Sequence, residues 1–363
     1  MDRTLLPKTL TLLLLAMVSS AGQTKPSGEV DPVKCWMYPT GEASGEMLAS
    51  DGAQIFIGID GGKVEALSPD GKKVWSSDLG GEIRSNILPV PGILLLVTAT
   101  ASTAAGNATD NILRSLSRET GITSWTLKLA AAEEYFLGSA NGSVVVISKD
   151  GAIQAFDTKN GTPKWKRQIA ESFVGEPVFT GSRAIVAAAS GELSVVSLVT
   201  GEIASIRKSA LSATALAETA DGASIVGDGR GNVTVFTNGS DKPYWKFKSG
   251  GEISHVFEAG GQVVAISHDN FVYLLAGRSG SVLWKKRMPG RISSASVHAG
   301  KYVVLSSFEE HSAIILDLSN GKVIGQIPLA GDETVTAIDA SGKTIFVLSS
   351  AAAYGFSLTG CLK

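Results

Sequence analysis

Short apolar runs of about five residues alternate along this chain with turns rich in glycine, aspartate and asparagine. One apolar run covers Val144–Ser148 and is followed by Lys149-Asp150-Gly151; an alternating run, Ala152–Phe156, then leads to Asn160-Gly161. Aspartate, asparagine and glycine tolerate the positive φ of tight hairpin turns, so this segment predicts strands joined as hairpins. The same phrase recurs at 55–67, 185–198, 224–236, 263–275 and 303–316.

The tryptophans occupy one fixed point of this phrase and recur at intervals of about forty residues. The interval of 80 residues between Trp165 and Trp245 spans two periods, and a copy without tryptophan lies midway, around Ser205. An eighth copy has Gly325 in the tryptophan position. A period of this size indicates a repeat protein. The six tryptophans are Trp36, Trp75, Trp125, Trp165, Trp245 and Trp284.

Each period predicts four strands. One more apolar segment precedes the repeated phrase, as at 251–262 and 290–301, and the segment that carries the tryptophan adds the fourth strand. Four-stranded units repeated radially form a β-propeller. Because eight tryptophan positions are present, we expect an all-β, eight-bladed β-propeller that forms a single domain over residues 33–363.

The two ends of the chain predict how the propeller closes. The last period supplies three strands and stops at Gly360, and the segment around Trp36 would supply the missing fourth strand. Cys361 follows Gly360 and Cys35 precedes Trp36, so this closure places the two cysteines side by side. We expect a Cys35–Cys361 disulfide; an intermolecular bridge and a metal-bound thiolate pair are the alternatives.

The N-terminus has the composition of a secretory signal. Arg3 and Lys8 precede a short apolar run, and the small residues Ser19-Ser20-Ala21 follow it. The run is shorter than the roughly 20 residues that span a bilayer, and an uncleaved anchor is the alternative. We expect residues 1–21 to be a signal peptide and 22–32 a flexible linker. The mature protein would then be exported and soluble, in the periplasm or outside the cell.

The bulk composition narrows the range of partners. The formal net charge is −2, and charged residues make up only 18% of the chain, with 41 glycines. No basic excess points to a nucleic acid or an anionic membrane surface, so we expect no nucleic-acid partner. We also expect a monomer, because closure of the propeller leaves no open sheet array to extend.

The fullest copy of the phrase is AFDTKNGTPKW, ending at Trp165, and SLSRETGITSW, ending at Trp125, is a weaker copy. These copies resemble the tryptophan-docking repeat of the pyrroloquinoline quinone (PQQ)-like propellers, the quinoprotein alcohol dehydrogenase-like superfamily. The resemblance covers residues 33–363. It implies that each tryptophan packs between adjacent blades with its ring on a neighbouring peptide, which suits the large area that an indole buries.

The resemblance leaves two classes of function open. The quinoprotein dehydrogenases of the family have a vicinal Cys-Cys pair, a bound calcium and a catalytic aspartate; this shorter chain has no Cys-Cys and no C-x-x-C-H. The other class is that of the propeller scaffold of the outer-membrane β-barrel assembly machinery, which this chain resembles in size and number of blades. This chain differs from it in having no cysteine for lipidation at the cleavage point. We expect a non-enzymatic protein without cofactor that binds a protein or small ligand. The alternative is an oxidoreductase that uses PQQ with calcium, or a degenerate relative.

An acidic residue often stands where the first strand of a blade begins. First strands line the axis of a propeller, so these carboxylates could surround one mouth of the channel and hold a cation or a basic segment. The alternative is a set of solvated turn residues. Ala213 and Arg291 hold this position in two blades, and Arg291 could neutralise a neighbour. The acidic residues are Glu42, Glu82, Glu133, Glu171, Glu252 and Glu333.

Two further features are weaker candidates. The segment 98–111 makes one period about ten residues longer than the others, and we expect it to form a mobile loop. The four histidines are spaced like a metal site but do not align on the strand pattern, so we expect no zinc site. They are His255, His268, His298 and His311.

Overall fold

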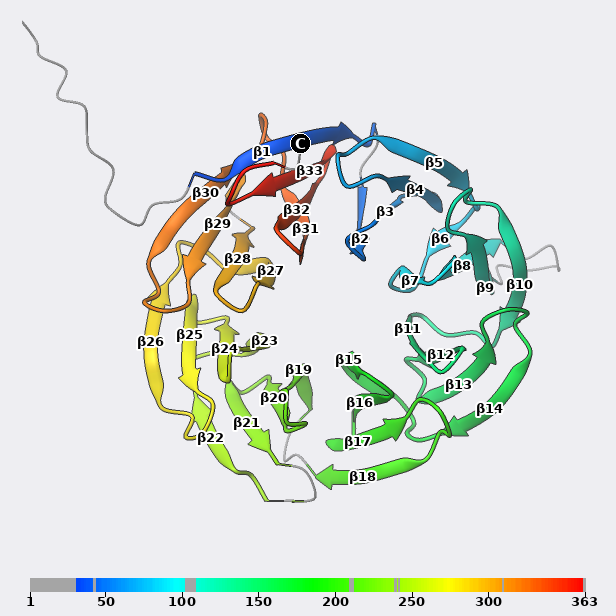
Figure 1. Ribbon diagram of the computed structural model, residues 1–363. Helices are drawn as coiled ribbons and strands as arrows, with labels where there is room; N and C mark the ends of the chain where they lie inside the picture. Colours follow the sequence, from blue (N-terminus) through cyan, green and yellow to red (C-terminus); the bar gives the residue numbers. More distant parts are fainter. Residues whose placement is uncertain are drawn as a thin grey trace, which may run out of the picture.

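The fold is an eight-bladed β-propeller, seen in a computed structural model that describes residues 31–41, 44–101, 109–208, 212–237, 240, 242–308 and 310–361. Within these ranges all regular structure is β-strand, arranged in eight antiparallel sheets. Figure 1 shows these sheets as blades around a common centre, with β2, β11, β15 and the other first strands innermost and β5, β10, β14 and their counterparts at the rim. The predicted fold class and number of blades are therefore confirmed.

The blades follow one another in sequence order, and the first seven are each built from consecutive strands. Blade 1 comprises β2 (Ser44–Ser50), β3 (Ile55–Ile59), β4 (Lys63–Leu67) and β5 (Lys73–Asp78). Blade 2 comprises β6 (Glu82–Ile83), β7 (Leu88–Val90), β8 (Ile93–Ala101), β9 (Thr109–Ser117) and β10 (Thr123–Leu129). Blade 3 comprises β11 (Tyr135–Ala140), β12 (Ser143–Ser148), β13 (Ala152–Asp157) and β14 (Pro163–Gln168). Blade 4 comprises β15 (Phe173–Thr180), β16 (Arg183–Ala188), β17 (Glu192–Ser197) and β18 (Ile203–Lys208).

The remaining blades repeat this order, except that the last one takes its fourth strand from the N-terminal end of the chain. Blade 5 comprises β19 (Ala213–Glu218), β20 (Ser224–Asp228), β21 (Asn232–Phe236) and β22 (Trp245–Lys248). Blade 6 comprises β23 (Ile253–Ala259), β24 (Gln262–Ser267), β25 (Phe271–Ala276) and β26 (Val282–Arg287). Blade 7 comprises β27 (Ile292–His298), β28 (Tyr302–Ser307), β29 (Ser312–Asp317) and β30 (Val323–Pro328). Blade 8 comprises β31 (Val335–Ser341), β32 (Thr344–Ser349), β33 (Ala352–Ser357) and β1 (Val33–Pro39).

The propeller closes where β1 pairs with β33. The pairing is antiparallel and places Trp36 opposite Gly355, as the predicted closure requires. A disulfide joins Cys35, at the register shift of β1, to Cys361, which follows β33, with a Cα–Cα distance of 5.3 Å. The bond uses both cysteines within one chain, in agreement with the predicted Cys35–Cys361 disulfide.

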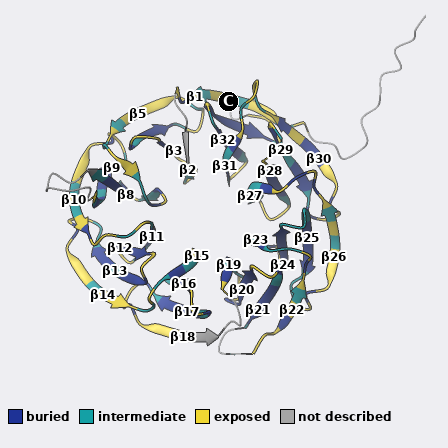
Figure 2. Cartoon of the chain, turned by 180° about the vertical axis from the view of Figure 1, so that it is seen from behind, coloured by how far each residue is buried: buried dark blue, intermediate teal, exposed yellow. Residues whose placement is uncertain are grey.

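The core lies between the blades. All six residues of β12 are buried, whereas the rim strand β14 is mostly exposed. The second and third strands pack against neighbouring blades on both faces, which explains why they read as continuous apolar runs. Figure 2 shows this gradient, with buried residues concentrated in the inner strands and exposed residues along the rim.

Every tryptophan lies at the boundary to the next blade. Trp165 of β14 donates its indole N–H to the carbonyl oxygen of Val199 in blade 4, at 3.0 Å. Its ring lies against Gly201, where a Cβ would come within 2.6 Å of the ring, so only glycine fits at this φ of +72°. The five other indoles donate in the same way to the carbonyl oxygens of Pro69, Arg118, Thr158, Gly277 and Leu318, at 2.7–3.1 Å.

Two blade boundaries lack this indole contact. In β18, Ser205 pairs with Val195, and in β30, Gly325 pairs with Ile315. Ser205 and Gly325 thus occupy the ladder position that Trp165 occupies in blade 3, where it pairs with Ala155. The boundaries between blades 4 and 5 and between blades 7 and 8 are therefore held by side chains other than tryptophan.

The predicted loop at 98–111 is wrong at both of its ends. Residues 98–101 belong to β8 and residues 109–111 to β9, so the extra length makes a longer hairpin. The segment is rich in small polar residues, which are common in loops, but its threonines favour strand conformation. Residues 102–108 lie outside the described part of the chain.

The predicted signal peptide and most of the predicted linker also lie outside the described residues, which begin at Asp31. In the described part of the chain, no helix is long and apolar enough to cross a membrane.

Candidate functional site

The inner strands depart from a common pattern in one sector of the propeller. In five blades the inner strand shows a register shift after its first paired residue, at Ser44/Met47, Ala213/Ala215, Ile253/His255, Ile292/Ser294 and Val335/Ala337. Blades 2, 3 and 4 have other arrangements. We call these three blades the irregular sector.

In blade 2 the inner strand is broken into β6 and β7. Between them, the side chain of Asn86 forms two hydrogen bonds with Leu137 of β11: Oδ1 accepts from the backbone N–H at 2.7 Å, and Nδ2 donates to the carbonyl oxygen at 3.1 Å. Ser85 also pairs with Tyr135 in an isolated parallel bridge. An amide side chain carries one acceptor and two donors, so Asn86 can take the place of a strand residue and tie blade 2 to blade 3.

In blade 4 the inner strand carries an insertion. The ladder of β15 with β16 shifts between Val174 and Val178, and the residues between them are Gly175, Glu176 and Pro177. Gly175 has a φ of +67°, and proline has no N–H to donate to a ladder. This Gly-Glu-Pro segment forms a bulge within β15, and Glu176 and Pro177 line both of the cavities described next.

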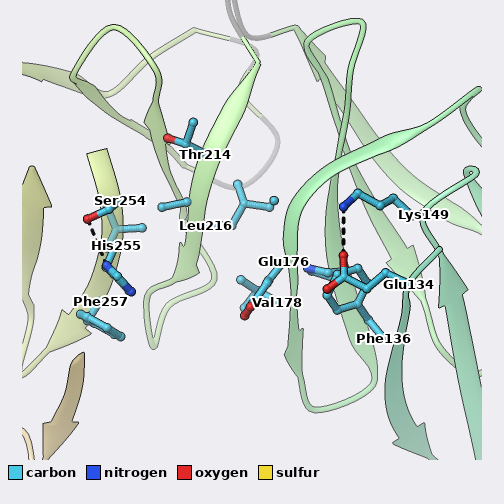
Figure 3. Close-up of a pocket in the computed structure, with 14 residues that line it drawn as sticks. Glu134, Phe136, Lys149, Glu176, Val178, Thr214, Leu216, Ser254, His255 and Phe257 are labelled. Carbon is cyan, nitrogen blue, oxygen red and sulfur yellow. Dashed lines mark hydrogen bonds and ion pairs between the residues drawn. The ribbon is translucent and has the colours of Figure 1, made fainter. Parts of the chain in front are cut away.

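Two adjoining cavities lie at the irregular sector, with volumes of about 590 and 370 Å³. They share the walls formed by Glu134, Phe136, Lys149, Glu176 and Pro177, and we treat them together as the central cavity. The larger part extends to blades 1 and 2, and the smaller part extends to blades 5 and 6. Figure 3 shows the smaller part, with Glu134, Phe136 and Lys149 on one wall and His255 and Phe257 on the opposite wall.

The walls combine carboxylates with aromatic rings. Glu134 pairs with Lys149 at 3.0 Å, and Glu82 pairs with Arg84 at 3.0 Å. The larger part of the cavity contains four carboxylates and two cations in its walls, so its fixed charge is negative. The carboxylates are those of Glu82, Glu133, Glu134 and Glu176, the cations are Arg84 and Lys149, and the rings include Phe136 and Phe179.

His255 faces the smaller part of the cavity as a neutral side chain. Burial lowers the pKa of His255 below its usual value, and the neighbouring His268 lowers it further. Its Nδ1 lies 3.1 Å from the Ser254 hydroxyl, and its ring stacks on Phe257 with centroids 6.0 Å apart. At neutral pH this wall therefore adds no positive charge to the cavity.

The residues predicted to surround the channel mouth lie in different settings. Glu82 and Glu133 line the central cavity, and Glu171 is exposed at the start of β15. Glu252 lies 3.9 Å from His268 Nδ1, and Arg291 is exposed before β27. Ala213 is buried in β19, and Glu42 lies outside the described residues.

Glu333 instead faces the strands of its own blade. Its carboxylate accepts hydrogen bonds from the hydroxyls of Ser349 and Tyr354, the latter at 2.8 Å. Burial raises the pKa of Tyr354 to about 12, with a further contribution from Glu333. This carboxylate is thus engaged within blade 8 rather than held out toward a ligand.

Sequence reasoning missed Glu134, Glu176 and Asn86. Glycine and proline inside a strand are signals of a bulge, so Gly175 and Pro177 could have identified the insertion that presents Glu176. Asn86 follows Arg84 and Ser85 in a segment that also contains Pro89, which is a comparable signal of a break.

The site of a quinone cofactor with calcium does not match the residues present. The vicinal cysteines of the quinoprotein dehydrogenases have no counterpart, since both cysteines of this chain form the disulfide beside β1 and β33. Among the described residues, no group of three or more histidine, cysteine, aspartate or glutamate side chains is placed to hold a metal ion. We therefore derive no chemical step through PQQ.

Comparison with known proteins places nearly the whole propeller in one family. The family model described as outer membrane protein assembly factor BamB matches residues 24–138, 109–220 and 203–355. The BamB of Yersinia pestis is 23% identical over 370 residues, covering 94% of this chain and 93% of that protein. The BamB of Burkholderia pseudomallei is 23% identical over 291 residues, covering 74% of this chain and 73% of that protein.

Solved structures support the same fold. The crystal structure of BamB from Moraxella catarrhalis matches 90% of this chain and 99% of its own, with a TM-score of 0.71 and 14% identity. A computationally designed protein, Ika8, matches 91% of this chain with a TM-score of 0.72 and 15% identity. At identities this low, the two structures show the fold alone. The family model, in contrast, spans nearly all of the propeller. The chain therefore belongs to the outer membrane protein assembly factor BamB family.

Proposed function

We propose that this protein is a non-enzymatic scaffold of the periplasm that binds a protein partner during the assembly of outer membrane proteins. The observation that carries the proposal is the match to two relatives named as outer membrane protein assembly factors, over 94% and 74% of the chain. The family model spans residues 24–355, which reach into every blade, so the match is not limited to a single shared repeat. Fold similarity by itself would not support a function.

The irregular sector supports the proposal by its chemistry. The propeller repeats one architecture eight times, and departures from a repeated rule are expected where function imposes another requirement. Here the departures in blades 2 and 4 line the same cavity. Its walls mix phenylalanine, proline and charged side chains, a combination typical of protein interfaces with an apolar centre and a polar rim.

The proposal is tested by reconstituting a complex from purified components. The mature protein would be cross-linked in an envelope extract of its source, the partner identified by mass spectrometry, and the complex re-formed from the two pure proteins. We expect co-elution in gel filtration and saturable binding in calorimetry with a component of outer membrane protein assembly. Failure of the pure proteins to associate would contradict the proposal.

A second assay addresses the oxidoreductase alternative. The protein would be incubated with PQQ and calcium, and then assayed for retained quinone absorbance and for dye reduction with alcohols. We expect neither signal, because the vicinal cysteines of the dehydrogenases have no counterpart in this chain. Tight uptake of the quinone together with dye reduction would overturn the non-enzymatic part of the proposal.

A further inference from the structure

We infer that Asn141 is a site of spontaneous covalent modification in the folded protein, by deamidation to aspartate and isoaspartate. Asparagine followed by glycine favours this reaction, because glycine has no side chain to hinder the approach of its own backbone nitrogen. The chain contains four Asn-Gly pairs, of which three lie within the described residues and begin at Asn141, Asn160 and Asn320. The fourth, Asn238-Gly239, lies outside the described part of the chain.

The reaction needs only the asparagine, the next backbone nitrogen and water. The glycine nitrogen loses its proton and attacks the side-chain carbon Cγ, so that a new C–N bond forms. The Cγ–Nδ2 bond breaks, and Nδ2 takes up a proton and leaves as ammonia, which closes a cyclic succinimide. Water then opens the ring at one of its two carbonyl carbons. One opening gives aspartate, and the other gives isoaspartate, in which Cβ becomes part of the main chain.

The side chains of Asn160 and Asn320 are held by hydrogen bonds. Oδ1 of Asn160 accepts from the N–H and the hydroxyl of Thr162, at 3.0 and 2.9 Å. Oδ1 of Asn320 accepts from the Lys322 N–H at 2.8 Å, and its Nδ2 donates to the Asp317 carboxylate at 3.0 Å. These bonds must break before Cγ can turn toward the nitrogen of the following glycine.

The attacking nitrogens of the same two turns are also engaged. The N–H of Gly161 donates to the Asp157 carbonyl oxygen at 2.9 Å, and that of Gly321 to the Asp317 carbonyl oxygen at 2.7 Å. Each glycine lies under an indole of the preceding blade, where a Cβ would come within 2.9 Å of the ring at Gly161 and 2.8 Å at Gly321. The peptide unit cannot rotate toward Cγ without displacing the indole, so tryptophan docking protects both turns. The two indoles are those of Trp125 and Trp284.

The turn at Asn141 lacks this protection. Asn141 and Gly142 form the two-residue turn between β11 and β12, with φ values of 47° and 68°, and both are exposed. Within the part of the chain that the structure describes, neither the Asn141 side chain nor the Gly142 N–H forms a hydrogen bond. A Cβ at Gly142 would meet nothing within 4 Å, so the peptide unit has room to rotate. The Gly142 carbonyl oxygen accepts from Thr158 and Lys164 at 3.1 Å, but these bonds hold the next peptide unit.

The modification would act on the inner wall of the propeller. β11 carries Phe136, which lines the central cavity, and Leu137, which is bonded to Asn86. Isoaspartate adds one atom to the main chain of a two-residue turn whose flanking residues, Ala140 and Ser143, pair with each other. Because the length of a hairpin turn sets the register of its strands, this product should disturb the pairing of β11 with β12.

The test is peptide mapping by mass spectrometry of the full-length mature protein during incubation in mildly alkaline buffer. We expect Asn141 to convert at least about tenfold faster than Asn160 and Asn320, since a factor of ten in rate corresponds to about 1.4 kcal/mol, close to the contribution of one retained hydrogen bond. Chromatography of the peptides separates the aspartate and isoaspartate products. In concentrated guanidinium we expect the three rates to converge, because the protection at the other two turns is lost with the fold.

The variant Asn141→Gly locates the modification. Glycine accepts the positive φ of this turn and has no amide to lose, so the change in mass at this position should disappear. The rates at Asn160 and Asn320 should stay as they are in the wild type.

A second variant tests the shielding by the indole. Trp284→Ala uncovers Gly321 and should raise the rate at Asn320 several-fold. The matched control is Trp245→Ala, which removes an indole that lies over Gly280, a glycine preceded by serine. The control carries a similar loss of packing and should leave the rate at Asn320 unchanged. Thermal unfolding of each variant verifies that it is folded under the incubation conditions.

The outcomes that overturn the inference are distinct from those that bear on the proposed function, which needs no modification. Conversion of Asn160 or Asn320 as fast as that of Asn141 in the folded protein would overturn it. So would a preference for Asn141 that persists in guanidinium, because it would then come from the neighbouring sequence and not from the fold. An equal rise at Asn320 in Trp284→Ala and Trp245→Ala would refute the protection assigned to the indole.

Discussion

Cys35 and Cys361 lie with their Cα atoms 5.3 Å apart although 326 positions separate them in sequence. The bond between them spans the point at which the first and last described strands pair. A disulfide that closes so long a loop removes much of the freedom of the unfolded chain. The bond therefore acts on the whole propeller, and not on blade 8 alone.

Replacing both cysteines, in Cys35→Ser/Cys361→Ser, should lower the free energy of unfolding by several kcal/mol, up to about 6 in the chain-entropy account. Guanidinium unfolding of the oxidised wild type and the double variant would measure the difference. Reductant should weaken the wild type to the level of the variant and leave the variant unchanged. An equal effect of reductant on both proteins would show that the bond is not the cause.

Gly201→Ala should destabilise the propeller more than Gly181→Ala, although both glycines lie in blade 4 at positive φ. A Cβ at Gly201 would meet the Trp165 ring at 2.6 Å, whereas a Cβ at Gly181 would meet nothing within 4 Å. Both variants carry the backbone cost of about 1–2 kcal/mol, and the clash adds about 1–3 kcal/mol at Gly201. Thermal unfolding of the two variants would separate these contributions; equal losses would argue against tryptophan docking as the reason for this glycine.

Asn86→Asp should lower stability by about 1–3 kcal/mol, because the new carboxylate cannot donate to the Leu137 carbonyl oxygen and would face it directly. The control is Asn160→Asp, since Asn160 uses only its Oδ1, as acceptor from the Thr162 N–H and hydroxyl. A carboxylate retains both of those contacts. Chemical unfolding of both variants is the measurement, and a control loss as large as that of Asn86→Asp would contradict the role given to the amide.

The protein should lose stability as the pH falls below about 7. Burial lowers the pKa of His255 and of His298 in the folded state, so the unfolded chain binds more protons around the usual histidine pKa of about 6.5. The free energy of unfolding then decreases with falling pH, by at most about 1.4 kcal/mol per pH unit for each histidine.

Urea unfolding between pH 8 and pH 5.5 would measure this slope, and His255→Phe should reduce it. The change in stability of each protein is measured relative to its own value at pH 8, where neither His255 nor His298 is protonated. A wild-type stability that rises as the pH falls across this range would contradict the assignment of the two buried histidines.

The architecture could be predicted because its chemistry is periodic. Trp165, Gly201 and the hairpin turns recur at one spacing, so each copy reinforces the others, and the two ends complete each other at Trp36. Ser205 and Gly325 were placed correctly by the same count, as their strand partners Val195 and Ile315 show.

The candidate site was harder to predict because it consists of departures from that period. The orientation of a side chain at the start of a strand depends on the register, and a shift of one residue moves it to the other face. Glu133 and Glu333 hold equivalent positions in the sequence pattern, yet one lines the central cavity and the other bonds to Tyr354 within its own blade. A pattern averaged over eight copies cannot show where one copy inserts Gly175-Glu176-Pro177.

The pairing of β1 with β33 also sets an order for folding. The first propeller strand to be synthesised has its partner in the last one, with seven complete blades made between them. Contacts so distant in sequence form late, because the intervening chain must be ordered before its ends can meet. Until blade 8 is complete, β1 is a strand without a sheet and β33 has an open edge, which is the state most prone to pair with another molecule. The risk of intermolecular pairing is therefore greatest between the synthesis of the first propeller strand and that of the last.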